Sequence, residues 1–171
     1  MANTYALRRV NWGMSEAGVL AQEGPPMEQM DSGALAYRVQ LAGADATLFY
    51  RFHHNALTSA AYHFDDHDDV ADVATHERLR ELLTTKYGRP DTNVDSRSQY
   101  HTRVPETFGE LAKAVARGEL EITSRWETSE SRILLSLRED REKYNAFVAL
   151  LYQDIAFDNE SAHRADDLDM L

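Results

Sequence analysis

Hydrophobic and polar residues alternate in three short runs between Ala34 and Phe64. The runs read ALAYRVQL, ATLFYRFH and LTSAAYHF, and the turn signals AGAD and HNA separate them. Alternation with a period of two is typical of strands that bury one face, and short polar turns join neighbouring antiparallel strands. The segment therefore predicts a three-stranded antiparallel meander, with His54 and Asn55 in its second turn.

Three other segments have the sequence pattern of helices. Ser15 is a good N-cap for a short helix, and Gly24 with the two prolines after it ends that helix. A longer apolar stripe predicts a helix over residues 70–87. Pro105 fits the first turn of a third helix, which Gly118 ends.

Three more strand candidates follow in the second half, over residues 120–126, 133–137 and 147–157. The last is apolar on both faces, which indicates a central strand or a partly helical segment. We predict an α+β fold in which an antiparallel sheet of about six strands forms two three-stranded meanders, with helices packed on one face as an α-βββ pseudo-repeat. Residues 1–157 form a single domain in this interpretation, and residues 158–171 form an acidic, flexible tail.

The composition is that of a soluble globular protein. The chain has 171 residues, of which 43% are hydrophobic and 27% charged, and it contains no cysteine. Disulfides, thiolate metal sites and cysteine nucleophiles are therefore excluded. The N-terminal sequence has no apolar signal-peptide core, and no apolar run approaches the roughly 18 residues that span a bilayer. We expect a cytoplasmic protein that does not enter a membrane.

The formal net charge is −11, from 29 acidic and 18 basic residues. Such a surface repels phosphate backbones, which argues against nucleic-acid binding through a basic patch. An acidic decoy that occupies a basic partner surface is one functional hypothesis. The chain also has none of the GxSxG, GxxxxGK[ST] and GxGxxG motifs of hydrolases, P-loop proteins and dinucleotide-binding proteins.

Several short motifs are similar to those of a group of small, mostly uncharacterised bacterial α+β proteins. Besides the meander, the residues that carry the resemblance are Trp12-Gly13, Glu23-Gly24-Pro25, Lys86-Tyr87-Gly88 with Pro90, and Trp126-Glu127-Thr128 with Ile133. Over Val10 to Phe157 the layout also resembles the folds of the β-lactamase-inhibitor protein and of the SmpA/OmlA-type outer-membrane assembly lipoprotein. Proteins with those two folds bind other proteins, so the resemblance implies protein binding without catalysis. The chain departs from the lipoprotein type, which has a signal peptide and a lipidated cysteine.

Histidines and aspartates gather in the sequence HFDDHDD, which begins at His63. Imidazole and carboxylate groups are ligands for zinc, nickel and manganese. In an extended segment His63, Asp65 and His67 face the same way about 6–7 Å apart. They are our candidate ligands for a divalent metal, in a metal-binding protein or a metal-dependent hydrolase. The alternative is a solvated loop that caps the following helix. His53 cannot join them, because the hairpin places it about 20 Å from His63.

The second predicted strand carries an aromatic and a basic side chain on the same face. Its apolar alternation leaves Phe49, Arg51 and His53 together on the other face. An open sheet face with an aromatic residue and an arginine suits protein recognition, whereas burial under a helix or loop is the alternative. Our leading hypothesis is therefore a non-enzymatic protein-protein interaction module without a cofactor, which binds another protein through these three residues.

Overall fold

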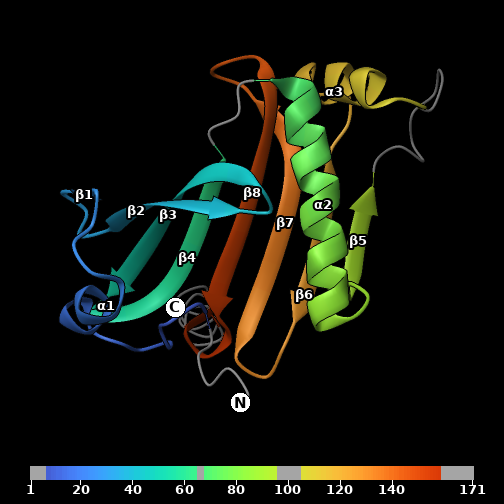
Figure 1. The fold of residues 1–171 in the computed structure, drawn as a ribbon. Coiled ribbons are helices and arrows are strands. Elements are labelled where there is room, and N and C mark those ends of the chain that lie inside the picture. The colour runs from blue at the N-terminus through green and yellow to red at the C-terminus, as the bar shows by residue number, and fades with distance from the viewer. Residues whose placement is uncertain (1–6, 65–67, 96–104, 159–171) are drawn as a thin grey trace, which may run out of the picture.

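The computed structural model describes residues 7–64, 68–95 and 105–158. Its body is one antiparallel sheet of eight strands in the order β1-β2-β3-β4-β8-β7-β6-β5 (Figure 1). The strands are β1 (Glu28–Gln29), β2 (Leu35–Leu41), β3 (Ala44–His53), β4 (Ala56–Phe64), β5 (Thr92–Asp95), β6 (Ile122–Glu127), β7 (Ser131–Asp140) and β8 (Asn145–Asp154). The fold is α+β, and the pairing of β4 with β8 joins the two halves of the sheet.

The prediction of about six strands in two three-stranded meanders is wrong. Each half contributes four strands, because β1 pairs with β2 at one edge and β5 pairs with β6 at the other. β1 has two residues and β5 has four, and both are mainly polar. Strands this short show no measurable hydrophobic alternation, so only their backbone pairing reveals them.

The longer helices are α1 (Glu16–Glu23), α2 (Asp69–Tyr87) and α3 (Phe108–Ala116), and residues 155–158 form a further single helical turn. Ser15 caps α1 and Asp68 caps α2, and each side chain accepts a hydrogen bond from a backbone amide of the first turn. α3 begins later than predicted because Thr107 is its cap, which leaves Pro105 outside the helix. Since α2 precedes β5 and α3 follows it, the α-βββ pseudo-repeat is also wrong. Across the described ranges, no helix is both long and apolar enough to cross a membrane.

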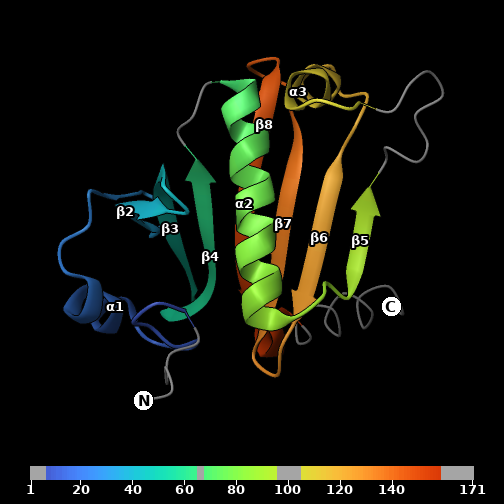
Figure 2. The ribbon, with the colours of Figure 1, turned by 45° about the vertical axis from the view of Figure 1, so that its right-hand side comes forward.

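α2 and α3 pack against β7 and β8 on one face of the sheet, and α2 runs along these strands (Figure 2). α1 lies on the same side, where Glu23 at its end accepts a hydrogen bond from the Tyr50 hydroxyl group at 2.7 Å. Strand register places the core on this face. Its fully buried members include Leu35, Leu48, Tyr50, Ile122, Trp126, Ile133, Leu135, Leu137 and Leu150.

The segment predicted to be central or partly helical is both. β8 lies in the middle of the sheet between β4 and β7, and residues 155–158 after it are helical. Of the predicted acidic tail, only Asp158 falls within the described residues. The described chain thus ends four residues after the central strand β8.

Candidate binding face

The face of the sheet opposite α1, α2 and α3 is the candidate functional surface, and we call it the open face. The register assigns to it alternate side chains of the four central strands β3, β4, β8 and β7. Its central members include Phe49, Arg51, Ala61, His63, Phe147, Ala149, Leu151, Leu134, Arg132 and Arg138. Ala61 is buried, as are Thr47 and Ser136 on the same face, and the others are half-buried or exposed. The surface therefore combines apolar side chains with guanidinium groups.

The three residues predicted for binding lie on the open face of β3. Phe49 is half-buried, and Arg51 and His53 are exposed. The turn that follows β3 consists of His54 and Asn55, whose φ angles are 47° and 61°. Positive φ at both central positions is what a tight two-residue hairpin turn requires. The predicted turn is thus confirmed. The three side chains share one face because they alternate along the same strand.

A row of three rings crosses the open face from β3 to β8. The ring centroid of His63 lies 4.9 Å from that of Phe49 and 5.6 Å from that of Phe147. His63 pairs with Thr47, as the predicted hairpin requires, and this pair lies at the opposite end of the hairpin from His53. Phe147 could not be predicted from the sequence pattern, because β8 reaches β4 only through long-range pairing. We call Phe49, His63 and Phe147 the aromatic row.

Arginine side chains flank the aromatic row. Burial lowers the pKa of His63 below its ordinary value of 6.5, and the nearby charges of Arg51 and Arg138 lower it further. Arg51 and Arg138 are both exposed. Positive charge therefore stands on either side of the row, in a protein whose net charge is −11.

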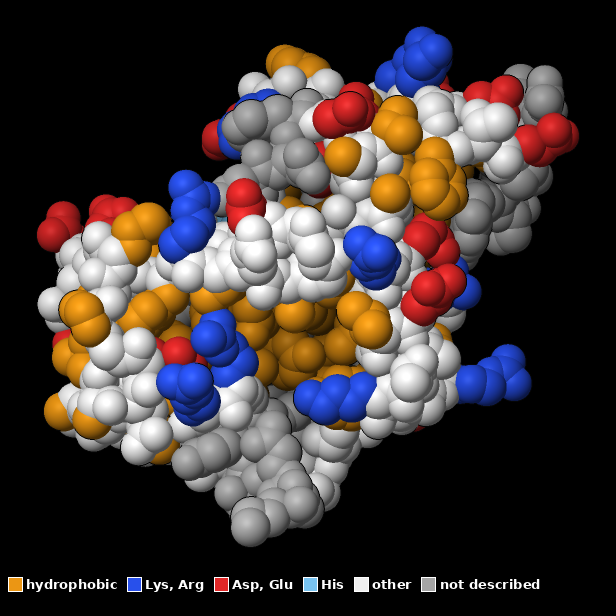
Figure 3. All heavy atoms as spheres, viewed as in Figure 1, with side chains coloured by type: hydrophobic (Ala, Val, Ile, Leu, Met, Phe, Trp, Pro, Cys, Tyr) orange, Lys and Arg blue, Asp and Glu red, His pale blue; other side chains and the backbone are white. Residues whose placement is uncertain are grey.

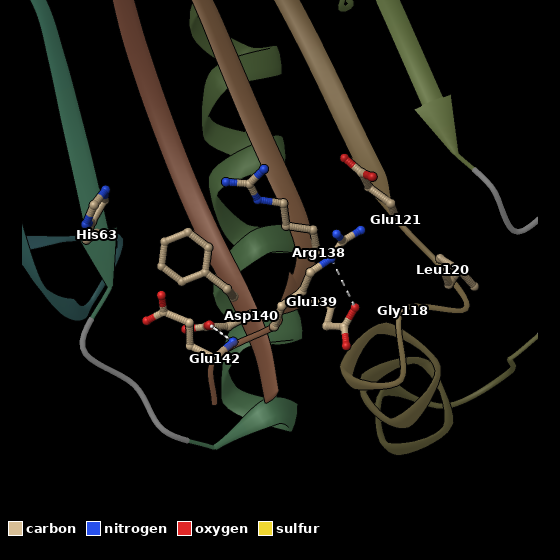
Figure 4. A pocket seen from close by; sticks show the side chains of 10 residues that line it. His63, Gly118, Leu120, Glu121, Arg138, Glu139, Asp140 and Glu142 are labelled. Atoms are coloured by element: carbon tan, nitrogen blue, oxygen red, sulfur yellow. Dashed lines mark hydrogen bonds and ion pairs between the residues drawn. The ribbon is translucent and has the colours of Figure 1, made fainter. Parts of the chain in front are cut away.

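A pocket of about 770 Å³ opens where the aromatic row meets the β7–β8 turn (Figure 4). His63, Phe147 and Arg138 line one part of it. Four carboxylates, from Glu121, Glu139, Asp140 and Glu142, line the rest together with Gly118, Leu120 and Arg141. The Asp140 side chain accepts a hydrogen bond from the backbone amide of Glu142 at 3.0 Å, which supports the turn. The recess extends the aromatic row and has room for a partner's side chain.

The opposite end of the open face is occupied by the chain that leaves β8. The Phe157 ring lies 5.0 Å from the His53 ring, and Asp158 forms an ion pair with Arg132. His53 therefore lies at the border of the candidate surface, in contact with the protein's own chain. Phe49, Arg51, His63, Phe147 and Arg138 form the part that faces outward.

The predicted metal ligands are only partly within the described residues. Asp65 and His67 lie outside them, and His63 lies between two phenylalanine rings. Within the ranges that the structure describes, no group of three histidine, aspartate or glutamate side chains is arranged to hold a metal ion. The metal site stays a prediction, which elemental analysis of the purified protein would check directly.

Stability is expected to fall as the pH drops below 6.5, in part because of His63. Its pKa is lowered in the folded state, whereas the ordinary value of 6.5 applies to the unfolded chain. The unfolded state therefore takes up the proton first, and the free energy of unfolding decreases until the folded pKa has also been passed. Urea unfolding at about pH 7.5 and about pH 5 should show a smaller loss for His63→Gln than for the native protein. An equal loss in both proteins, or an NMR titration midpoint for His63 at or above 6.5, would contradict this prediction.

Comparisons with protein-family models, with curated proteins and with solved structures find no match. The resemblance to small bacterial α+β proteins and to the two protein-binding folds therefore stays a prediction.

Proposed function

We propose that this protein is a non-enzymatic binding module whose open face recognises an acidic segment of another protein that carries apolar anchor residues. The observation that carries the proposal is the aromatic row between Arg51 and Arg138, on the face that α1, α2 and α3 leave uncovered. Phe49 and Arg51 of this site were predicted from the sequence, and His63, Phe147 and Arg138 join them in the structure. His53 lies at the border of the site.

The apolar part of the open face supports binding by contact. Leu134, Leu151 and Ala149 extend the aromatic row across β7 and β8, and all three are half-buried. Aromatic and arginine side chains are the residues that most often carry the binding energy of protein interfaces, especially at the centre of the patch. Shielding these groups from water on binding therefore supplies the main driving force.

The charges on the open face indicate an acidic partner. Two exposed guanidinium groups beside an aromatic row favour carboxylates in the opposing segment, because each pairs with two carboxylate oxygens in a fixed geometry. The acidic decoy hypothesis, in which this chain presents carboxylates to a basic partner, gains no support from this face. The carboxylates around the pocket border the face on one side, so they restrict where an acidic partner would lie.

Selection of peptides from a random library displayed on phage tests the proposal. The selected peptides are expected to combine aspartate or glutamate with aromatic or branched aliphatic residues. Their affinities would be measured by calorimetry for the native protein, for Phe49→Ala and for the double variant Arg51→Glu/Arg138→Glu. Each variant should bind at least about tenfold more weakly, as is usual for central interface residues. Arg89→Glu, in the exposed segment between α2 and β5, makes one such charge reversal away from the open face; it is the control and should bind like the native protein.

Two results would overturn the proposal. One is selection of peptides without an acidic preference. The other is unchanged binding by Phe49→Ala and by the double variant, with melting temperatures close to that of the native protein. A large fall in the melting temperature of Phe49→Ala would instead show that this ring belongs to the core.

A further inference from the structure

The chain changes from strand to helix where β8 ends. The Asp154 side chain accepts a hydrogen bond from the backbone amide of Ala156 at 3.0 Å, at the start of the helical turn of residues 155–158. Phe157 and Asp158 complete this turn, and both are half-buried. The described chain thus ends with an aromatic ring and a carboxylate, two kinds of side chain that suit the partner proposed for the open face.

Both of these side chains contact the open face. The Phe157 ring lies 5.0 Å from the His53 ring on β3, and Asp158 forms an ion pair with Arg132 on β7. Arg132 also pairs with Glu127 on β6, with 3.5 Å between its Nε atom and a carboxylate oxygen. The protein's own chain therefore begins to occupy the open face in the way proposed for a partner, with an apolar ring and a carboxylate beside an arginine.

The chain that follows Asp158 is acidic and contains apolar residues. Residues 159–171, which we call the C-terminal segment, lie outside the described ranges and have the sequence NESAHRADDLDML. The segment has four carboxylates and a single arginine, and the run DDLDML within it combines three carboxylates with three apolar side chains. This composition matches the partner proposed for the open face, so the complementary charges belong to one chain.

The C-terminal segment is long enough to reach the aromatic row. Arg132, which holds Asp158, lies six residues from Arg138 along β7, and this separation is about 20 Å in a strand. Seven residues, 159–165, precede the run DDLDML, and an extended chain of that length spans about 23 Å. The run can therefore lie beside Arg138 and over Phe147, which is paired with Arg138 across β7 and β8.

We infer that the C-terminal segment binds the open face of its own chain and competes there with the partner. This regulation rests on the proposed function, since the segment and the partner use the same site. A segment tethered at the border of its binding site has an effective concentration in the millimolar range, so even a weak contact keeps the face occupied. The partner has to displace the segment, which lowers the apparent affinity of the protein for it.

The helix-bearing side of the sheet is the alternative position for the C-terminal segment. Figure 3 shows that basic and hydrophobic side chains lie near one another on that side too. The contacts of Phe157 and Asp158 favour the open face, because the segment starts there. An experiment therefore has to report on which side of the sheet the segment lies.

A spin label on the C-terminal segment tests its position. The native chain has no cysteine, so Ala165→Cys provides a single attachment site and leaves the run DDLDML intact. The label is expected to broaden the methyl NMR signals of Leu134 and Leu151, which lie on the open face. Leu82 is exposed on α2, on the other side of the sheet, and its methyl signals should stay sharp.

Neutralising two carboxylates of the C-terminal segment tests the competition. Asp166→Asn/Asp167→Asn should reduce the broadening of the open-face methyl signals. It should also bind a peptide selected for the open face at least about threefold more tightly than the native protein, because the tethered competitor is weaker. Asp31→Asn/Glu81→Gln makes the same charge change at exposed positions in the β1–β2 turn and on α2, and should leave both measurements unchanged.

Three results would overturn the inference. One is broadening of Leu82 without broadening of Leu134. Another is broadening that disappears on about tenfold dilution, which would place the segment on a second copy of the chain. The third is native peptide affinity in folded Asp166→Asn/Asp167→Asn; peptide binding that Phe49→Ala still weakens would then leave the proposed function standing. Failure to select any peptide, with the native protein or with the double variant, would overturn the proposed function instead.

Discussion

Replacing Trp126 by alanine is expected to lower the free energy of unfolding by about 3–5 kcal/mol, which would be among the largest effects of any single substitution. The side chain is 1% exposed and lies opposite Ile133 on the helix-bearing face of β6. Its Nε1 donates a hydrogen bond to the Gly88 carbonyl oxygen at 2.9 Å. Gly88 is the residue at which α2 ends, so Trp126 both fills the core and fixes that helix to the sheet.

Thermal and urea unfolding of Trp126→Ala and Trp126→Phe would separate these two contributions. Trp126→Phe keeps most of the packing and removes the hydrogen bond, and we expect it to cost about 1–2 kcal/mol. Trp12 makes a similar hydrogen bond, from its Nε1 to the Ser131 hydroxyl oxygen at 2.8 Å, but it is only partly buried. The same substitutions at Trp12 are therefore the matched control. A cost below about 1 kcal/mol for Trp126→Ala would show that the core closes around the missing ring.

Replacing Tyr50 by phenylalanine is expected to destabilise the protein by about 1–3 kcal/mol. The change removes the hydroxyl group that donates to Glu23, whose side chain is only 6% exposed. The carboxylate would keep its ion pair with Arg8 but lose a buried donor. Since burial and the Glu23 carboxylate raise the pKa of Tyr50 above its ordinary value of 10, its stabilising contribution is present below pH 10 and is lost as the pH rises further.

Two comparisons make the Tyr50 prediction specific. Tyr37→Phe removes a hydrogen bond to the backbone carbonyl oxygen of the half-exposed Gly24 and should cost no more than about 1 kcal/mol. Tyr50→Phe/Glu23→Leu removes both partners and should recover part of the loss, because no buried carboxylate is left without its donor. A double variant that is less stable than Tyr50→Phe would refute this explanation.

The first half of the fold could be predicted because its signals are local. β2, β3 and β4 each alternate with a period of two, and His54 and Asn55 mark their second turn. The bounds of α1 and α2 follow from a polar cap at the start and a glycine at the end. Each of these features depends on residues that are neighbours in sequence.

Pairings between distant segments could not be predicted in the same way. β1 and β5 are too short to show a period, and the contact of β4 with β8 connects segments from the two halves of the chain. The same distinction between local and long-range signals applies to the candidate site. Phe49 and Arg51 follow from the alternation of one strand, whereas Phe147 and Arg138 join them only once β8 and β7 are placed beside β4.

The central position of β8 determines when the sheet can be completed. β8 is the last strand along the described chain, yet it separates β4 from β7. During synthesis both halves therefore emerge with an unpaired edge of nine or ten residues until β8 leaves the ribosome. Exposed edges of this length invite pairing with other chains. A nascent or C-terminally cleaved chain would therefore be prone to aggregate, and rapid insertion of β8 would protect the complete protein.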